Sequence, residues 1–194
     1  MSAKWPWSWE RGCAVALAGM IAIYVAVMSR AQIVKYESFD MGFDLALQEQ
    51  IVWNTAHGRW FATSTLASTD IDLGRDVILL DALLALPYKL LPDTRTLLVL
   101  QTVAVGLGVL PLYGLARIRL GPGAALALSA AYLVYLPVHY LNLYEFQVRA
   151  FALGPIFAMF YFLERDRPGP FVASMLLALT TRSDVALVVA MFGV

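Results

Sequence analysis

Long apolar runs separated by short polar segments are the main pattern along this chain. The first run covers residues 13–28, and with residues 29–34 it reaches the roughly 20 residues that a membrane-spanning helix needs. Further spanning helices are predicted within residues 95–194, from apolar runs at 96–116, 124–141, 150–163 and 171–194. The pattern predicts an all-α, multi-pass transmembrane helical bundle, with one transmembrane domain over residues 1–194 and its first spanning helix at 13–34.

The apolar run at residues 77–91 fits a spanning helix poorly. It is short, and it contains three residues that suit a span badly, namely Asp81, Pro87 and Lys89. If it spanned, the basic turn at 117–119 would lie outside, against the rule that basic loops stay in the cytoplasm. The run is therefore predicted to be an interfacial helix within an outer loop at residues 35–94.

Charges around the apolar runs predict the orientation of the chain in a cell membrane. Lys4 and Arg11 precede the first span, so the N-terminus is expected in the cytoplasm and residues 35–94 on the outer side. A cleaved signal peptide is the competing interpretation of the first run. Because the sequence stops within an apolar run, we expect these residues to be the N-terminal part of a longer protein.

Composition agrees with an integral membrane protein. Hydrophobic residues make up 60% of the chain and charged residues 14%, and the mean hydropathy is +0.70. A net charge of zero, with no basic run among aromatic residues, argues against a nucleic-acid partner. Membrane lipids are the expected partners, and the sequence leaves protein partners unidentified. The single cysteine, Cys13, excludes a disulfide framework.

The polar stretch at residues 37–58 is the strongest candidate for chemistry. Read as one helix, it places Asp40, Asp44 and Gln48 on one stripe, which suits a helix lying at a membrane surface. Carboxylates at the membrane boundary can act as general bases or cation ligands. The alternative interpretation is a solvated face of an interfacial helix.

Other charged residues are expected near this outer face. The outer loop is acidic, since Glu37, Asp40, Asp44, Glu49, Asp70, Asp72 and Asp76 outnumber Lys35, Arg59 and Arg75. Arg149 is either a headgroup anchor or a phosphate ligand. Arg182 either pairs with Asp184 inside an apolar segment or binds an anion in an outer cavity. His57 and His139 have no second ligand at metal spacing and are expected to be structural, and the glycines at 106 and 108 are expected to serve helix packing.

Several segments carry a resemblance to a known family. FDLALQEQIVWNTAHGRWF at 43–61 resembles the YDLGxFDQALWNTAHG-type signature of a predicted prokaryotic membrane-protein family, domain of unknown function 2079. Residues 90–121, 142–157 and 181–189 are similar to later blocks of the same family. The resemblance covers nearly the whole chain.

This resemblance implies a fold and an activity. The family is grouped with glycosyltransferases of the C-type membrane fold, which take sugars from polyprenyl-phosphate carriers on the outer face of the membrane. Their first outer loop holds interfacial helices and a catalytic aspartate. Asp44 matches the aspartate of the family's YD pair and is the expected catalytic carboxylate, with Asp40 second. Glu49 matches the second acidic residue of the motif, and Asp76 stands at a family histidine position.

The leading hypothesis is an inverting, membrane-bound glycosyltransferase with a lipid-phosphate sugar donor. Asp44 would deprotonate an acceptor hydroxyl. The expected substrate-binding residues are Glu49, Asp76, Lys89, Arg149 and Arg182, of which the basic ones would offset the charge of the departing phosphate. A divalent cation held by Asp44 and a neighbouring carboxylate stays open, because the spacing establishes none.

Departures from the family pattern keep two other hypotheses open. The family's Asp-Phe-His-Pro-Glu reads Glu-Phe-Gln-Val-Arg at residues 145–149, and its Lys-Glu-Asp reads Arg-Ser-Asp at 182–184. These changes suit a non-catalytic membrane subunit or a degenerate relative. A transporter is the third hypothesis, because Arg182 and Asp184 interrupt an apolar segment.

Overall fold

A computed structural model describes the chain except for residues 1–6, 65–70, 72, 74–75 and 194. Lys4, Asp70, Asp72 and Arg75, to which the sequence assigns charge roles, lie outside the described residues. The regular elements of the described part are helices, which confirms the all-α prediction: α1 (Trp7–Glu37), α2 (Phe43–Ala56), α3 (Leu80–Leu90), α4 (Thr94–Leu107), α5 (Val109–Leu120), α6 (Pro122–Val134), α7 (Leu136–Leu143), η2 (Val148–Ala152), α8 (Leu153–Glu164), α9 (Pro168–Leu179), α10 (Val185–Ala190) and η3 (Met191–Gly193).

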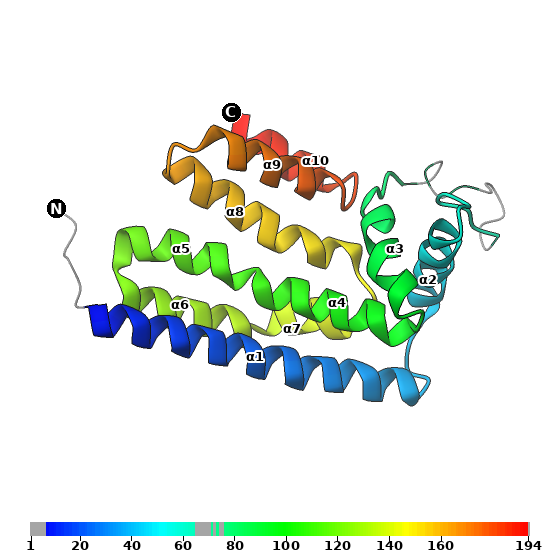
Figure 1. Ribbon diagram of the computed structural model, residues 1–194, viewed down its shortest axis with the longest axis horizontal. Coiled ribbons are helices and arrows are strands. Elements are labelled where there is room, and N and C mark those ends of the chain that lie inside the picture. The colour runs from blue at the N-terminus through cyan, green and yellow to red at the C-terminus, as the bar shows by residue number, and fades with distance from the viewer. Residues whose placement is uncertain (1–6, 65–70, 72, 74–75, 194) are drawn as a thin grey trace.

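The helices are arranged as an elongated bundle with a separate group at one end (Figure 1). Helix α1 packs on α4 and α6, α5 packs on α6 and α8, and α8 packs on α9. Helices α2 and α3 pack on each other and stand across the end of the bundle that lies farthest from the N-terminus (Figure 1). The polar stretch after α1 is therefore held at one end of the long helices.

Two helical stretches are long and apolar enough to cross a membrane. They are Trp9–Glu37, with 29 residues, and Thr94–Leu120, with 27 residues, in which α4 continues into α5 through a helical Gly108. Helices α6 and α7 form a third candidate if the pair, which is bent by 44°, counts as one span. Spanning helices predicted at 13–34 and 96–116 thus correspond to helices of sufficient length.

The two last apolar runs form shorter helices than the sequence suggests. Helices α8 and α9 have 12 residues each, which corresponds to about 18 Å against a hydrocarbon thickness of about 30 Å. The final run is divided between α9 and α10, and the hydroxyls of Thr180 and Thr181 donate to the carbonyls of Leu177 and Ala178 at this break. Local hydroxyl bonds of this kind compete with a continuous helix.

The prediction of one helical stripe through Asp40, Asp44 and Gln48 is wrong. Helix α1 ends at Glu37, and Phe39 adopts a left-handed backbone with φ of 56°, which stops a helix. Asp40 therefore lies in the turn between α1 and α2. Asp44 is exposed in the first turn of α2, whereas Gln48 is buried on the inner face of that helix.

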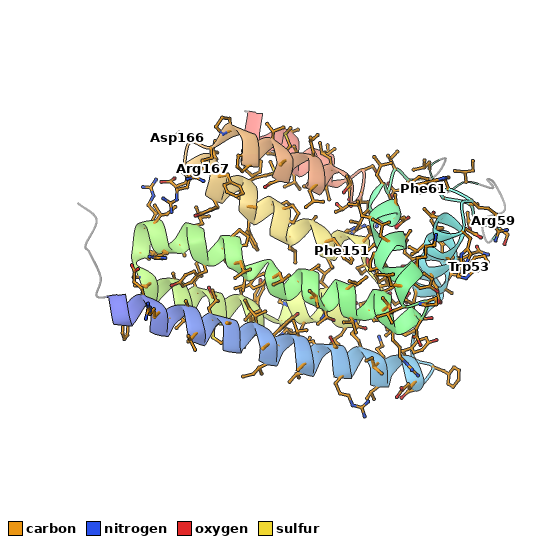
Figure 2. The ribbon with its side chains drawn as sticks, in the orientation of Figure 1. Trp53, Arg59, Phe61, Phe151, Asp166 and Arg167 are labelled. Atoms are coloured by element: carbon orange, nitrogen blue, oxygen red, sulfur yellow. The ribbon has the colours of Figure 1, made fainter. Side chains whose placement is uncertain are left out.

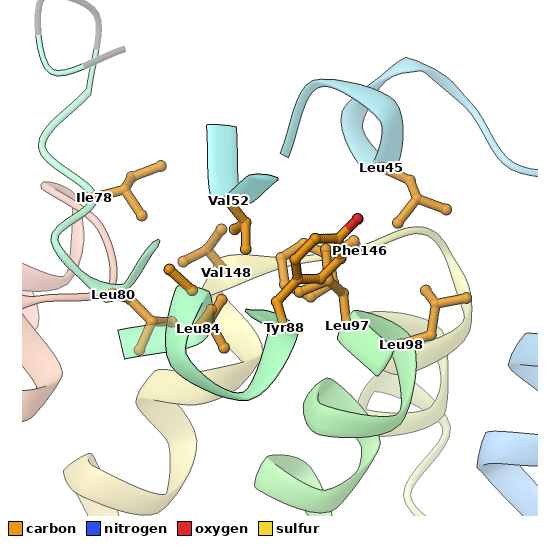
Figure 3. Close-up of a cluster of buried hydrophobic side chains, with 11 residues drawn as sticks. Leu45, Val52, Ile78, Leu80, Leu84, Tyr88, Leu97, Leu98, Phe146 and Val148 are labelled. Atoms are coloured by element: carbon orange, nitrogen blue, oxygen red, sulfur yellow. The ribbon is translucent and has the colours of Figure 1, made fainter. Parts of the chain in front are cut away.

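An apolar cluster attaches the end group to the bundle (Figure 3). Its buried side chains come from α2, α3, α4 and the segment before α8, and they include Leu45, Val52, Leu84, Tyr88, Leu97, Phe146 and Val148. Glycines tighten the bundle further along: a Cβ atom at Gly106 would lie 3.0 Å from Cγ2 of Val25 and 3.3 Å from Cδ1 of Tyr24. This close contact with α1 confirms the interpretation of Gly106 as a packing residue.

Basic turns gather at the other end of the bundle. Arg117 and Arg119 at the end of α5 form ion pairs with Glu10 of α1 at 2.7 Å and with Glu164 of α8 at 2.6 Å. Asp166 and Arg167 also lie at this end, far from Trp53 and Arg59 (Figure 2). The turns that the sequence assigns to one side of a membrane therefore do lie together in the fold.

Candidate functional site

Three of the predicted site residues, Asp76, Arg149 and Arg182, come together with Asp184 in a group that we call the arginine cluster. Nε of Arg182 lies 3.1 Å from Oδ2 of Asp76 and 3.8 Å from Oδ1 of Asp184, and Nε of Arg149 lies 3.2 Å from Oδ2 of Asp184. The cluster joins the segment before α3, the short helix η2 and the break between α9 and α10. Arg182 thus pairs more closely with Asp76 than with the Asp184 that the sequence suggests.

The arginines of this cluster remain accessible. The Arg149 side chain is 49% exposed and that of Arg182 is 35% exposed, whereas Asp76 is only 10% exposed. A guanidinium group has five N–H donors and matches the geometry of phosphate oxygens. Both arginines can therefore bind a further anion beside the aspartates.

Asp76 is held as a carboxylate. Burial by itself raises the pKa of this group, but hydrogen bonds from the hydroxyl of Ser183 at 2.6 Å and from its N–H, together with the charge of Arg182, bring the pKa below the ordinary value of 3.8. A carboxyl group with a lowered pKa stabilises the fold at pH values above its ordinary pKa. Asp76 thus connects the segment before α3 to the α9–α10 break.

We expect Asp76→Asn to lower the melting temperature of the detergent-solubilised protein by roughly 4–8 °C. This shift corresponds to the loss of about 2 kcal/mol of unfolding free energy, the usual contribution of a hydrogen bond to a charged group. Because the folded-state pKa is lowered, this contribution is complete above pH 4 and disappears as the pH falls through the folded-state pKa. The difference between variant and wild type should therefore shrink below about pH 4. Thermal scans at pH 7, 5 and 3 measure it, and a difference that stays constant at pH 3 would contradict this role.

An apolar groove of about 380 Å³ extends to Thr181, the chain neighbour of Arg182. It is lined from α4, α5, α8 and α9, by residues that include Gly108, Phe151, Gly154, Leu177 and Thr181. Leu80, which also lines it, donates its N–H to the carbonyl of Thr180 at 2.8 Å, and Thr181 directly precedes Arg182. An apolar groove with charged side chains close to one of its lining residues has the two features that an amphiphilic ligand requires.

Asp44 faces a carboxylate that the sequence did not place in the site. The backbone N–H of Asp44 donates to Oε2 of Glu145 at 3.1 Å. Glu145 comes from the loop after α7, about 100 positions away in the chain. The signal available in the sequence was a carboxylate beside Phe146 in the third family block, but no spacing rule connects it to α2. Asp40 lies close by in the chain, exposed in the preceding turn.

Glu49 is engaged within the protein. Its Oε1 accepts hydrogen bonds from the hydroxyls of Tyr88 at 2.9 Å and Thr94 at 2.5 Å, and Tyr36 donates to Thr94 at 3.3 Å. Burial, the hydrogen bond to Glu49 and its charge raise the pKa of Tyr88, which therefore stays a donor. Glu49 thereby ties α2 to α3 and to the start of α4.

Lys89 lies apart from the other predicted site residues. It is exposed in the last turn of α3, and within the described part of the chain it has no ion pair or hydrogen bond from its side chain.

The sequence interpretation missed a buried polar contact between α2 and α3. The side-chain amide of Gln48 donates to Oδ1 of Asp81, which is fully buried in α3.

Histidines have structural contacts, as the sequence predicts. A ring nitrogen of His57 lies 2.7 Å from the carbonyl oxygen of Trp53, and one of His139 lies 2.6 Å from that of Leu133. Among the described residues, no three His, Cys, Asp or Glu side chains are grouped as they would be around a metal ion.

Comparison with known proteins adds one finding. A family model described as "Predicted membrane protein (DUF2079)" matches residues 35–194, which include Asp44, Glu145 and the whole arginine cluster. No curated protein and no solved structure matches the chain.

Proposed function

The chain belongs to the DUF2079 family of predicted membrane proteins, and on this premise we propose that it is a glycosyltransferase that takes a sugar from a polyprenyl-phosphate carrier. The observation that carries this proposal is the joint position of an exposed carboxylate, an arginine cluster and an apolar groove. Asp44 in α2 and the cluster, which includes Asp76 before α3, belong to one end of the helix bundle, and Thr181 beside Arg182 in the chain lines the groove.

The proposed orientation places α2 and α3 on the outer side of a cell membrane, with a multi-pass bundle below them. Helix α3 buries Asp81, Leu84 and Tyr88, and it exposes leucines at 83, 86 and 90, with exposed Leu79 directly before it. With 11 residues it is too short to span, so an exposed leucine row suits a helix lying in the interface. The basic turns at the opposite end favour a cytoplasmic N-terminus.

The donor fits this arrangement by its chemistry. A polyprenyl-phosphate sugar has a long apolar chain and a charged phosphate. The chain would lie in the groove lined by Gly154 and Leu177, and the phosphate would extend beyond Thr181 to bind Arg149 and Arg182. Planar guanidinium groups bind phosphate oxygens through two N–H donors at once.

The proposed reaction is a single displacement. The carboxylate of Asp44 takes the proton of an acceptor hydroxyl, and the hydroxyl oxygen forms a bond to the anomeric carbon of the sugar. The bond from that carbon to the phosphate oxygen breaks on the opposite face, with inversion. Its electron pair stays on the phosphate, where Arg149 and Arg182 stabilise the additional charge.

Mass spectrometry of lipids that copurify with the protein in mild detergent tests this proposal. We expect a polyprenyl-phosphate sugar to be enriched over the membrane extract, and to be depleted in an Arg149→Gln/Arg182→Gln double variant. An Arg165→Gln/Arg167→Gln variant, altered at the opposite end, is the matched control. Bulk phospholipids alone in all three preparations would contradict the proposed donor.

A further inference from the structure

The loop after α7 is held in place by polar side chains of α1 and α4. Gln101 of α4 is fully buried, and its Nε2 donates to the carbonyls of Asn142 at 2.9 Å and Glu145 at 3.1 Å. Its Oε1 accepts the N–H of Gln147 at 2.5 Å. Lys35 of α1 donates to the carbonyls of Leu143 and Tyr144 at 2.9 and 2.6 Å. These contacts leave the backbone of the loop little freedom.

The carboxylate of Glu145 projects from this loop onto the first turn of α2. Its Oε2 accepts the N–H of Asp44 at 3.1 Å. An uncompensated N–H at a helix N-terminus attracts a negative group, because the helix dipole adds to the hydrogen bond. Glu145 thus contacts the backbone of the residue that carries the proposed base.

Gly42 makes room for this contact. A Cβ atom at position 42 would overlap Oε1 of Glu145 and would lie 2.9 Å from its carboxyl carbon. The backbone of Gly42 is extended, with φ of −97° and ψ of −160°, so an alanine can adopt it without strain. A methyl group at position 42 would therefore displace the Glu145 carboxylate, the end of a flexible side chain, and would not strain the backbone.

We propose that Glu145 is a positioning residue for Asp44, held by Gln101 and accommodated by Gly42. This inference rests on the proposed function, since it assigns Glu145 a task in the transfer step. By fixing the first turn of α2, Glu145 sets the direction of the Asp44 carboxylate toward the acceptor hydroxyl. Misplacement of a reacting group by about 1 Å can cost on the order of 100-fold in rate. The donor phosphate binds elsewhere, at the arginine cluster, so donor affinity does not depend on Glu145.

Steady-state kinetics of the full chain in vesicles, with a polyprenyl-phosphate sugar as donor, test the inference. We expect Glu145→Ala and Gly42→Ala each to lower kcat by about 10–100-fold with the donor KM unchanged. The double variant should lose no more than either single variant, because both remove the same contact. Glu145→Gln keeps an acceptor oxygen and should retain kcat within about threefold of wild type. Gly169→Ala is the matched control, because a Cβ atom there meets nothing within 4 Å.

Hydrogen–deuterium exchange of the first turn of α2 gives a readout that does not need turnover. Amide exchange near Asp44 should be faster in Glu145→Ala and Gly42→Ala and unchanged in Gly169→Ala. Retention of kcat within twofold in the first two variants, a rise in KM instead, or an equal loss in Glu145→Gln would overturn the positioning role. If the wild type transfers no sugar, the proposed function fails. In that case, unchanged amide exchange near Asp44 in Glu145→Ala and Gly42→Ala would also overturn the contact of Glu145 with α2, whereas faster exchange would support this contact.

Discussion

Asp44→Asn is expected to lower the turnover of a polyprenyl-phosphate sugar by about 10²–10⁴-fold, the usual contribution of a general base. Asparagine has nearly the same shape as aspartate but cannot accept the hydroxyl proton. The hydrogen bond to Glu145 comes from the backbone N–H of residue 44, so the substitution leaves this contact in place. Because Asp44 is exposed, the melting temperature should change little. Turnover is measured as loss of the donor in vesicles.

Two matched variants make this result specific. Asp166→Asn introduces the same change at the opposite end of the bundle and should leave turnover unchanged (Figure 2). Its backbone φ of 50° is one that asparagine tolerates. Asp40→Asn alters the turn before α2 and should change turnover by less than about threefold. A larger loss in Asp40→Asn than in Asp44→Asn would transfer the role of base to Asp40, and full activity in both would favour a non-catalytic subunit.

Arg149→Gln is expected to raise the donor KM by about 10–100-fold, with a smaller change in kcat. This corresponds to about 1.5–3 kcal/mol for a hydrogen bond to a charged group. Arg149 is the better test than Arg182, because it is 49% exposed and pairs only with the half-exposed Asp184 among the described residues. Its loss should therefore affect ligand binding more than folding. Turnover measured over a range of donor concentrations gives both KM and kcat.

The structure supplies controls for the Arg149 prediction. Arg167→Gln removes a cation from the basic end of the bundle and should leave KM unchanged (Figure 2). Arg182→Gln should raise KM as well, but it also breaks the 3.1 Å pair with Asp76 and should lower the melting temperature. An unchanged KM in both Arg149→Gln and Arg182→Gln would place the phosphate elsewhere.

The sequence by itself determined that this is a helical membrane protein, and it located the two helices that are long and apolar enough to span a membrane. The length of an apolar run is a local property of the sequence. The runs at 13–34 and 96–116 are long enough to cross the hydrocarbon core of a bilayer, where a segment must be helical whichever segments pack on it. The family was also readable from the sequence, because the segment at 43–61 is a contiguous motif. Asp44, Arg149 and Arg182 could be selected as candidates because charges are costly beside apolar runs and need a task or a partner.

Only the tertiary structure decided which of these residues act together. Asp76, Arg149 and Arg182 are distant in the chain, and they meet because η2, the segment before α3 and the α9–α10 break converge on one point. Glu145 reaches Asp44 because buried Gln101 holds its loop, and Gly42 leaves the space. A left-handed Phe39 separates Asp40 from the end of α1, so that Asp40 lies in the turn before α2. Contacts between distant segments depend on packing, whereas sequence periodicity reports only which residues share a face of one helix.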